Sequence, residues 1–77
     1  MKLRDSQVET LRAVGEMSDR SARASSLWIA ERLGVSDSAA YRRCARLESR
    51  RYLASDFVHG RCWYSLTQLG REALEGR

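Results

Sequence analysis

The sequence has no proline, a single histidine and only two cysteines among its 77 residues. Cys44 and Cys62 are far from Cys-x-x-Cys spacing, so we expect free thiols packed as small core residues in a reducing compartment. His59 has no carboxylate or cysteine at ligand spacing, which argues against a metal site. The chain also lacks a glycine-rich phosphate loop, a nucleophile–base pair and a carboxylate pair suited to acid–base chemistry. We therefore expect neither an enzyme nor a bound cofactor.

Long apolar runs are absent as well. No stretch approaches the ~20 apolar residues that span a bilayer, and the N-terminal Met-Lys-Leu-Arg-Asp lacks the apolar core of a secretory signal. A composition of 43% hydrophobic and 31% charged residues is typical of a globular protein. We expect one domain over residues 1–77, in the cytoplasm and without a membrane contact.

The first part of the chain is typical of an amphipathic helix followed by a polar loop. The helix is predicted at residues 6–17, where Ser6 and Glu9 have the spacing of a capping box. A loop is expected at 18–26, and residues 22–24 within it could add a short extended segment. The expected buried positions are Val8, Leu11 and Val14 or Gly15, with Leu3 just ahead of the helix.

Two further helices flank a short turn that contains glycine. A serine caps the second helix, predicted at about 26–33, and Gly34 ends that helix in a left-handed conformation. Ser36 then caps a third helix at 37–51. A helix, a glycine-containing turn of three or four residues and a second helix form the layout of a helix-turn-helix, here at about 26–51.

The third helix carries most of the chain's excess charge. Residues 36–53 hold five arginines against Asp37 and Glu48, a surplus of +3 in a chain whose net charge is +4. A scattered surplus would indicate little beyond solubility, whereas a concentrated one indicates a binding surface for a polyanion. The alternative is a solvated helix face with internal ion pairs. The apolar seam opposite the arginines consists of Ala40, Cys44 and Leu47.

After residue 53 the apolar residues alternate with polar ones, which is the period of a half-buried strand. A hairpin is predicted at 57–64 within a wing at about 54–66. His59 and Gly60 form its two-residue turn. The inward strand positions are expected to be Cys62, Tyr64 and Leu66.

A last helix is predicted at about 68–75, capped by Thr67. Its inward positions are expected to be Leu69, Ala73 and Leu74. The predicted fold class is therefore mainly α with a small β-hairpin, in the order helix, helix, helix, hairpin, helix.

Three segments in this order resemble a winged helix-turn-helix DNA-binding domain of the MarR, ArsR and PadR kind. Residues 28–36 (Trp-Ile-Ala-Glu-Arg-Leu-Gly-Val-Ser) resemble the positioning helix and turn. Residues 40–53, with Arg-Leu-Glu at 46–48, resemble the recognition helix. Residues 64–71 (Tyr-Ser-Leu-Thr-x-x-Gly-Arg) resemble the last wing strand and the helix after it. Arg51 stands where these families usually have glycine, so it must end the third helix in another geometry or in a strained one.

The resemblance implies that helix 37–51 enters a major groove and that the hairpin acts as a wing. The residues that would then reach base edges are Ser38, Ala39, Arg42 and Arg46. Those that would contact the DNA backbone are Ser25, Ser26, Ser36, Tyr41, Arg43 and Arg50. From the wing, His59 and Arg61 would reach a minor groove or the backbone.

The sequence thus predicts a small transcriptional regulator that binds double-stranded DNA in a sequence-specific way. One alternative is a winged-helix adaptor that binds another protein, since a fold does not fix a function. Another is an accessory DNA-binding protein of recombination or packaging. A homodimer is a further hypothesis, with Trp28 and Trp63 as candidate contacts.

Overall fold

The computed structural model of the protein describes residues 3–21 and 23–76. Within these residues the fold is mostly helical, with four helices and a small antiparallel sheet. The elements in chain order are α1 (Asp5–Ser21), β1 (Ala24–Ser25), α2 (Ser26–Leu33), α3 (Asp37–Ser49), β2 (Leu53–Val58), β3 (Arg61–Leu66) and α4 (Gln68–Glu75). The predicted fold class and the order of its helices and hairpin are confirmed.

The sheet has one strand more than the predicted hairpin. Its strands lie in the order β1-β3-β2, and both pairings are antiparallel. The short β1 pairs with the middle of β3 through Ala24 opposite Tyr64 and Ser25 opposite Trp63. An extended segment at 22–24 was one expectation for this region. The structure places the strand at 24–25, while residue 22 lies outside the described residues.

The first helix is longer than predicted and begins with a different cap. It starts at Asp5 and continues to Ser21, so the loop expected over 18–26 is wrong. Ser6 lies inside the helix, and the capping box of Ser6 and Glu9 does not form. Instead the side-chain oxygen of Gln7 accepts from the backbone N–H of Arg4 at 2.9 Å, which is half of a capping box placed two residues earlier. Asp5 in the first turn also interacts favourably with the helix dipole.

The second and third helices begin where the sequence predicts. The Ser25 hydroxyl accepts from the backbone N–H of Trp28, and the Ser36 hydroxyl accepts from that of Ala39, both at 3.1 Å. Gly34 has a φ of 70°, the left-handed conformation expected for the residue that ends α2. These local signals fix the turn between the two helices.

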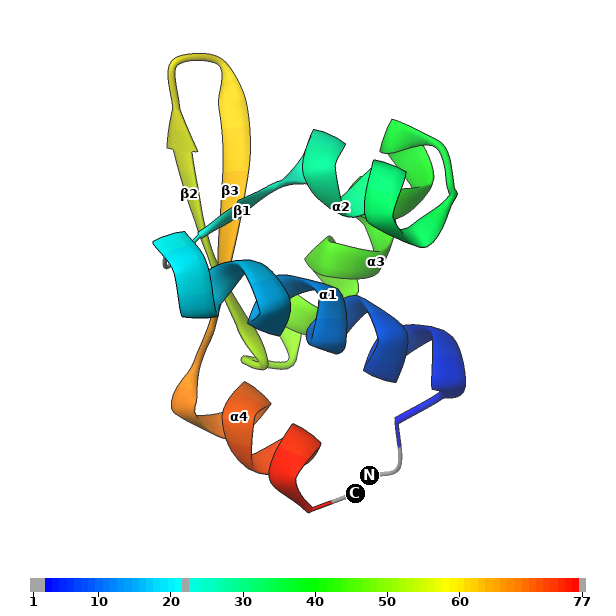
Figure 1. The fold of residues 1–77 in the computed structure, drawn as a ribbon, viewed down its shortest axis with the longest axis vertical. Coiled ribbons are helices and arrows are strands. Elements are labelled where there is room, and N and C mark those ends of the chain that lie inside the picture. Colours follow the sequence, from blue (N-terminus) through cyan, green and yellow to red (C-terminus); the bar gives the residue numbers. More distant parts are fainter. Residues whose placement is uncertain (1–2, 22, 77) are drawn as a thin grey trace.

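The core lies where α1, α2 and α3 meet the inner face of the sheet. Tyr64, at the centre of β3, is its largest fully buried side chain. Figure 1 shows α1 crossing the sheet, with the hairpin tip and α4 at opposite ends of the molecule. The buried hydrophobic side chains are Leu3, Val8, Leu11, Ala13, Val14, Ala24, Ile29, Ala30, Ala40, Cys44, Leu47, Leu53 and Tyr64.

The helix α4 packs through a different set of residues from the one predicted. Leu69 is 45% exposed, so its predicted inward position is wrong, whereas Ala73 and Leu74 do pack against the core. The buried residue of α4 is Gly70. A Cβ at Gly70 would lie 2.2 Å from the backbone oxygen of Tyr52, so only glycine allows α4 to approach this closely.

The end of α3 is strained at Arg51. Arg51 has a φ of 69°, which confirms that arginine here adopts the left-handed conformation that glycine usually supplies. The backbone N–H of Arg51 donates to the Glu48 oxygen at 2.8 Å and that of Tyr52 donates to the Leu47 oxygen at 2.9 Å, which is the Schellman pattern. The Thr67 hydroxyl donates to the Arg51 carbonyl at 2.6 Å and so holds the bend in place.

This strain predicts opposite effects of glycine at two neighbouring arginines. Arg51→Gly relieves a left-handed penalty of about 1–2 kcal/mol at the cost of about 0.5–1 kcal/mol of backbone entropy, so it should stabilise the fold slightly. Arg50 has a φ of −97°, so Arg50→Gly should only lose stability. Urea unfolding of both variants measures this difference. Equal destabilisation by the two substitutions would contradict the strain at Arg51.

Candidate nucleic-acid interface

The orientation of α3 is set by its narrow apolar seam. Ala40, Cys44 and Leu47 are each 0% exposed. Since these three positions recur at helical spacing on one face, burying all of them leaves the helix a single rotational setting. The opposite face must then point to solvent. The structure therefore confirms the seam predicted from the sequence and, with it, the outward direction of the arginines.

The outward face of α3 carries arginines without carboxylate partners. Arg42, Arg46 and Arg50 are exposed, and Arg43 is half-buried. In the described part of the chain, none of them has a carboxylate within ion-pair distance. The nearest acidic residue on the same helix, Glu48, accepts a hydrogen bond from the Ser55 hydroxyl of β2. The internally ion-paired face, which was the alternative reading of the sequence, is not what the structure shows for these residues.

Other arginines of the protein do form ion pairs. Arg32 of α2 donates from Nε and Nη2 to the two carboxylate oxygens of Glu16 on α1, at 2.8 and 2.7 Å. Arg23 donates to Asp56 at 2.7 Å. These ion pairs connect neighbouring elements, whereas the arginines of α3 form no ion pair with another element of the described chain. Their charge is left available to an external anion.

Three of the predicted base-reading residues gather around one shallow hollow on α3. The hollow is lined by Ala39, Arg42, Arg43 and Arg46. Ser38, the fourth predicted base-reading residue, is exposed in the first turn of the same helix. The structure thus brings the predicted base-reading set together on one surface.

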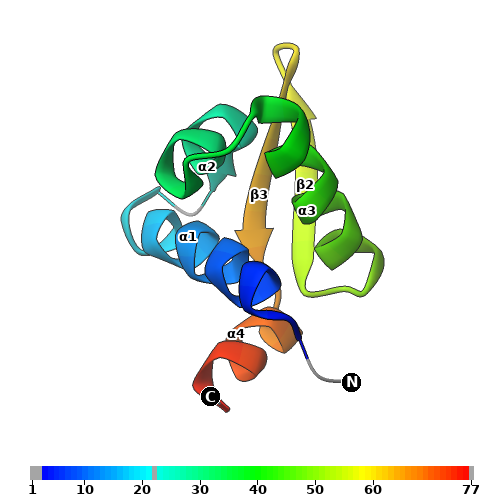
Figure 2. The same cartoon turned by 90° about the vertical axis from the view of Figure 1, so that its right-hand side faces the viewer.

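The hairpin presents its predicted residues at the tip. His59 and Gly60 have φ values of 52° and 74°, and Val58 pairs with Arg61 across them. Two consecutive residues with positive φ form the tight turn that suits a twisted hairpin, which confirms the predicted link. His59 and Arg61 are both exposed. The tip and the start of α3 lie toward the same end of the molecule (Figure 2).

Two predicted contact residues at the start of α2 are less accessible. Ser25 and Ser26 are each 8% exposed, and the Ser25 hydroxyl is already used as the α2 cap. Little side-chain surface is therefore accessible for the phosphate contact predicted for these two serines. Ser36 differs because it is exposed at the start of α3, although its hydroxyl also caps a helix.

Neither tryptophan is an open surface residue. Trp28 is half-buried and packs against the core. Trp63 is also half-buried, and the Arg23 guanidinium carbon lies 5.9 Å from the centre of its ring. Two exposed tryptophans would have indicated a protein contact, and the structure does not provide them. A homodimer through these residues stays a prediction.

The structure reveals an exposed aromatic side chain that the sequence reading left out. Phe57 of β2 is 71% exposed, and Tyr41 of α3 is 50% exposed. In the sequence, Phe57 counts only as a strand residue ahead of the turn. Its pairing with Cys62 places Phe57 on the inner face of the hairpin, where strand alternation predicts burial, so no local signal in the sequence indicates this exposure.

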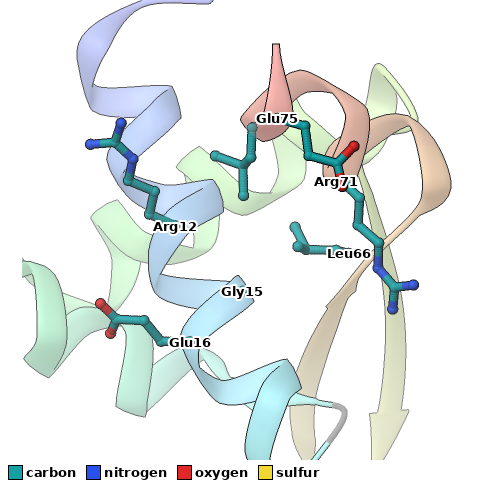
Figure 3. A pocket seen from close by; sticks show the side chains of 7 residues that line it. Arg12, Gly15, Glu16, Leu66, Arg71 and Glu75 are labelled. Atoms are coloured by element: carbon teal, nitrogen blue, oxygen red, sulfur yellow. The ribbon is translucent and has the colours of Figure 1, made fainter. Parts of the chain in front are cut away.

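A larger hollow lies between α1, the end of β3 and α4 (Figure 3). Its volume is about 510 Å³. Its lining holds two arginines and two glutamates, so its charges balance, and the guanidinium groups of Arg12 and Arg71 point away from each other (Figure 3). A balanced site does not attract a polyanion as the α3 face does. The residues that line it are Arg12, Gly15, Glu16, Leu66, Arg71, Leu74 and Glu75.

No protein-family model matches the sequence, and no curated protein matches it either. Structural matches run across the chain to MarR-family winged-helix transcriptional regulators. A MarR C80S mutant from E. coli in complex with operator DNA has a TM-score of 0.85 at 18% identity, over 97% of this chain and 53% of that one. BpsR from Bordetella bronchiseptica, whose DNA binding is regulated by 6-hydroxynicotinic acid, has a TM-score of 0.82 at 20% identity. The match covers 96% of this chain and 52% of that one. YusO from Bacillus subtilis has a TM-score of 0.82 at 24% identity, over 95% of this chain and 51% of that one.

The protein therefore has a MarR-like winged-helix fold, as the sequence predicts. The chain spans about half the length of the regulators that it matches. The helices α2 and α3 are followed by the hairpin of β2 and β3 and then by α4.

Two features are absent from the described residues. None of the helices formed by these residues is long and apolar enough to cross a bilayer. Within the same residues, no group of three or more histidine, cysteine or acidic side chains could hold a metal ion.

The buried thiol of Cys44 predicts a loss of stability at high pH. Burial is the main factor that raises the pKa of Cys44, from 9.0 to about 12, and burial also raises the pKa of Tyr64. The unfolded chain therefore releases the Cys44 proton from about pH 9, while the folded chain keeps it. The contribution of Cys44 to the free energy of unfolding is therefore fully present below pH 9, and it is lost as the pH rises toward 12.

At pH 10 the Cys44 contribution alone should be about 1.4 kcal/mol lower than at pH 7. Urea unfolding at the two pH values measures the change, and Cys44→Ala should reduce it. An identical pH dependence in Cys44→Ala would show that this thiol is not the cause.

Proposed function

We propose that the protein binds double-stranded DNA with sequence preference and acts as a small transcriptional regulator, with α3 in the major groove and the β2–β3 hairpin as a wing. The observation that carries this proposal is the face of α3, where exposed arginines point away from the core and pair with no carboxylate of the described chain. Guanidinium groups left unpaired on a rigid helix match the spacing and the charge of phosphates and base edges.

The base-reading role falls to the outermost residues of α3. Arginine donates in a bidentate way to the O6 and N7 atoms of guanine, and one such pair is worth roughly 1–3 kcal/mol of discrimination. The hollow between Arg42 and Arg46 gives these two side chains space to approach a base edge. The proposed base-contacting residues are Ser38, Ala39, Arg42 and Arg46.

The flanks of α3 and the hairpin tip would hold the DNA backbone. Phosphate contacts fix the orientation of the protein on the duplex and carry no sequence information. Ser36 lies at the N-terminus of α3, where free backbone N–H groups and the helix dipole favour an anion. The proposed backbone and wing contacts are Ser36, Tyr41, Arg43, Arg50, His59 and Arg61.

The similar structures support this assignment at the level of the fold. The MarR mutant from E. coli was solved with operator DNA bound. This chain matches that structure over 97% of its own length. We infer a role without catalytic activity, carried out in the cytoplasm where chromosomal DNA is accessible. A pairing of two copies on a palindromic site is part of the same proposal.

Single alanine substitutions separate base reading from backbone binding. Arg42→Ala and Arg46→Ala should reduce the preference for a selected sequence over random duplex by about 1–3 kcal/mol each, because each removes a base contact. Arg50→Ala should weaken all duplexes alike and lower the slope of log affinity against log salt by about 1, because it removes one phosphate contact. Titration of labelled duplexes at several salt concentrations measures both quantities.

Arg71→Ala is the matched control. It removes the same charge from an exposed position on α4 and should change neither the sequence preference nor the salt slope. Equal losses from all four substitutions would mean that only net charge matters, and would remove the assignment of α3. Equal losses of Arg42→Ala on selected and random duplexes would remove its base-reading role.

A further inference from the structure

Two exposed aromatic side chains lie on neighbouring elements, one on α3 and one on the hairpin. Phe57 on β2 is 71% exposed and Tyr41 on α3 is 50% exposed, which makes Phe57 the most exposed of the large hydrophobic side chains described. An aromatic ring in water costs free energy that burial would recover. The exposure of this ring beside a strongly basic helix therefore indicates that another molecule covers it.

The face of β2 that carries Phe57 is the face toward α3. The Ser55 hydroxyl of β2 donates a hydrogen bond to the Glu48 carboxylate of α3. Residues two apart in a strand share a face, so Phe57 lies on the same side as Ser55. Phe57 also pairs directly with Cys62 of β3, which shares its face of the strand with the buried Tyr64.

The register along the two elements places Phe57 opposite the middle of α3. The chain reverses after Ser49, so α3 and β2 run in opposite directions (Figure 2). From Ser55, Phe57 lies about 6.7 Å further toward the hairpin tip. From Glu48, Cys44 lies about 6 Å and Tyr41 about 10.5 Å in the same direction. Phe57 therefore lies level with Cys44 in the middle of α3, less than one helical turn from Tyr41.

The exposed charges near Phe57 indicate which ligand could cover it. On α3, Arg42 is exposed next to Tyr41, and the hairpin tip beyond Phe57 carries Arg61. The Glu48 carboxylate on this side of α3 accepts the hydrogen bond from Ser55. An apolar ring between cationic groups fits a chain that alternates anionic and apolar parts. The deoxyribose-phosphate strand has this pattern, because its phosphates take the guanidinium groups and its sugars present carbon to an aromatic face.

We propose that Phe57 packs against a deoxyribose of a DNA strand that passes between α3 and the hairpin tip. This contact is independent of sequence and adds affinity without adding charge. It rests on the proposed DNA binding and deepens it, since it assigns part of the affinity to an apolar contact that arginine substitutions leave intact.

The test compares Phe57→Ala with Leu69→Ala, which truncates another exposed hydrophobic side chain on α4, away from the hairpin tip. The probes are a short random duplex and the sequence selected from a random pool, each titrated at several salt concentrations. Phe57→Ala should weaken both duplexes by about tenfold, the lower end of the free energy of burying a phenylalanine side chain, with an unchanged salt slope. Phe57→Leu should keep most of the affinity, and Leu69→Ala should match the wild type.

The outcomes are distinguishable. If the wild type binds no duplex, the proposed function itself fails. If the wild type binds and Phe57→Ala binds equally well, only the Phe57 contact is overturned. A lower salt slope in Phe57→Ala would overturn an uncharged contact, and a loss confined to the selected sequence would overturn a contact to the sugar. Sedimentation of the free protein adds one more outcome: a Phe57→Ala variant that loses self-association while keeping its DNA affinity would assign the ring to a second copy instead.

Discussion

The burial of the α3 seam in the same core cluster as Tyr64 of the central strand is the constraint on which the rest of the structure depends. Ala40, Cys44 and Leu47 are completely buried, and Tyr64 is 1% exposed. Burial of small and medium side chains on one narrow stripe allows close approach and a single rotation of the helix. The arginines on the other face are thereby directed to solvent as a fixed array. A looser seam would let α3 turn, and the array would lose its geometry.

The same constraint explains the strain at the end of α3. For β2 to start beside the helix and pair with β3, the chain must reverse within residues 50–52. The left-handed Arg51, held by the Thr67 hydroxyl, makes this reversal, and Gly70 lets α4 press against the Tyr52 carbonyl. Strain in the backbone persists only where surrounding contacts fix it. Here the contacts come from the helix that follows the wing.

Much of this arrangement could be predicted from the sequence because its signals are local. Ser36 and Gly34 mark the ends of helices through their own backbone and side-chain chemistry, and the period of the α3 seam identifies its buried face. The start of α1 was mispredicted because Ser6 looks like a cap in isolation, while Gln7 caps the helix from inside its first turn. The third strand and the exposure of Leu69 depend on which distant elements meet, and a local pattern does not contain that information.

The candidate site, too, could be predicted from the sequence only in part. The outward arginines follow from the helical period alone, whereas their lack of carboxylate partners requires knowing where the acidic residues of other elements lie. Phe57 was missed for a related reason. Strand alternation assigns it to the inner face, and only the fold shows that the hairpin extends beyond the core, so that this inner position is open to solvent.

The most direct test of the account is an NMR titration of the isotope-labelled protein with a short random duplex at low salt. The largest amide shift changes should map to α3 and to the hairpin tip, and they should disappear as salt is raised. Shift changes concentrated instead on α1 and α4, with α3 unaffected, would contradict the claim that the arginine face of α3 binds DNA.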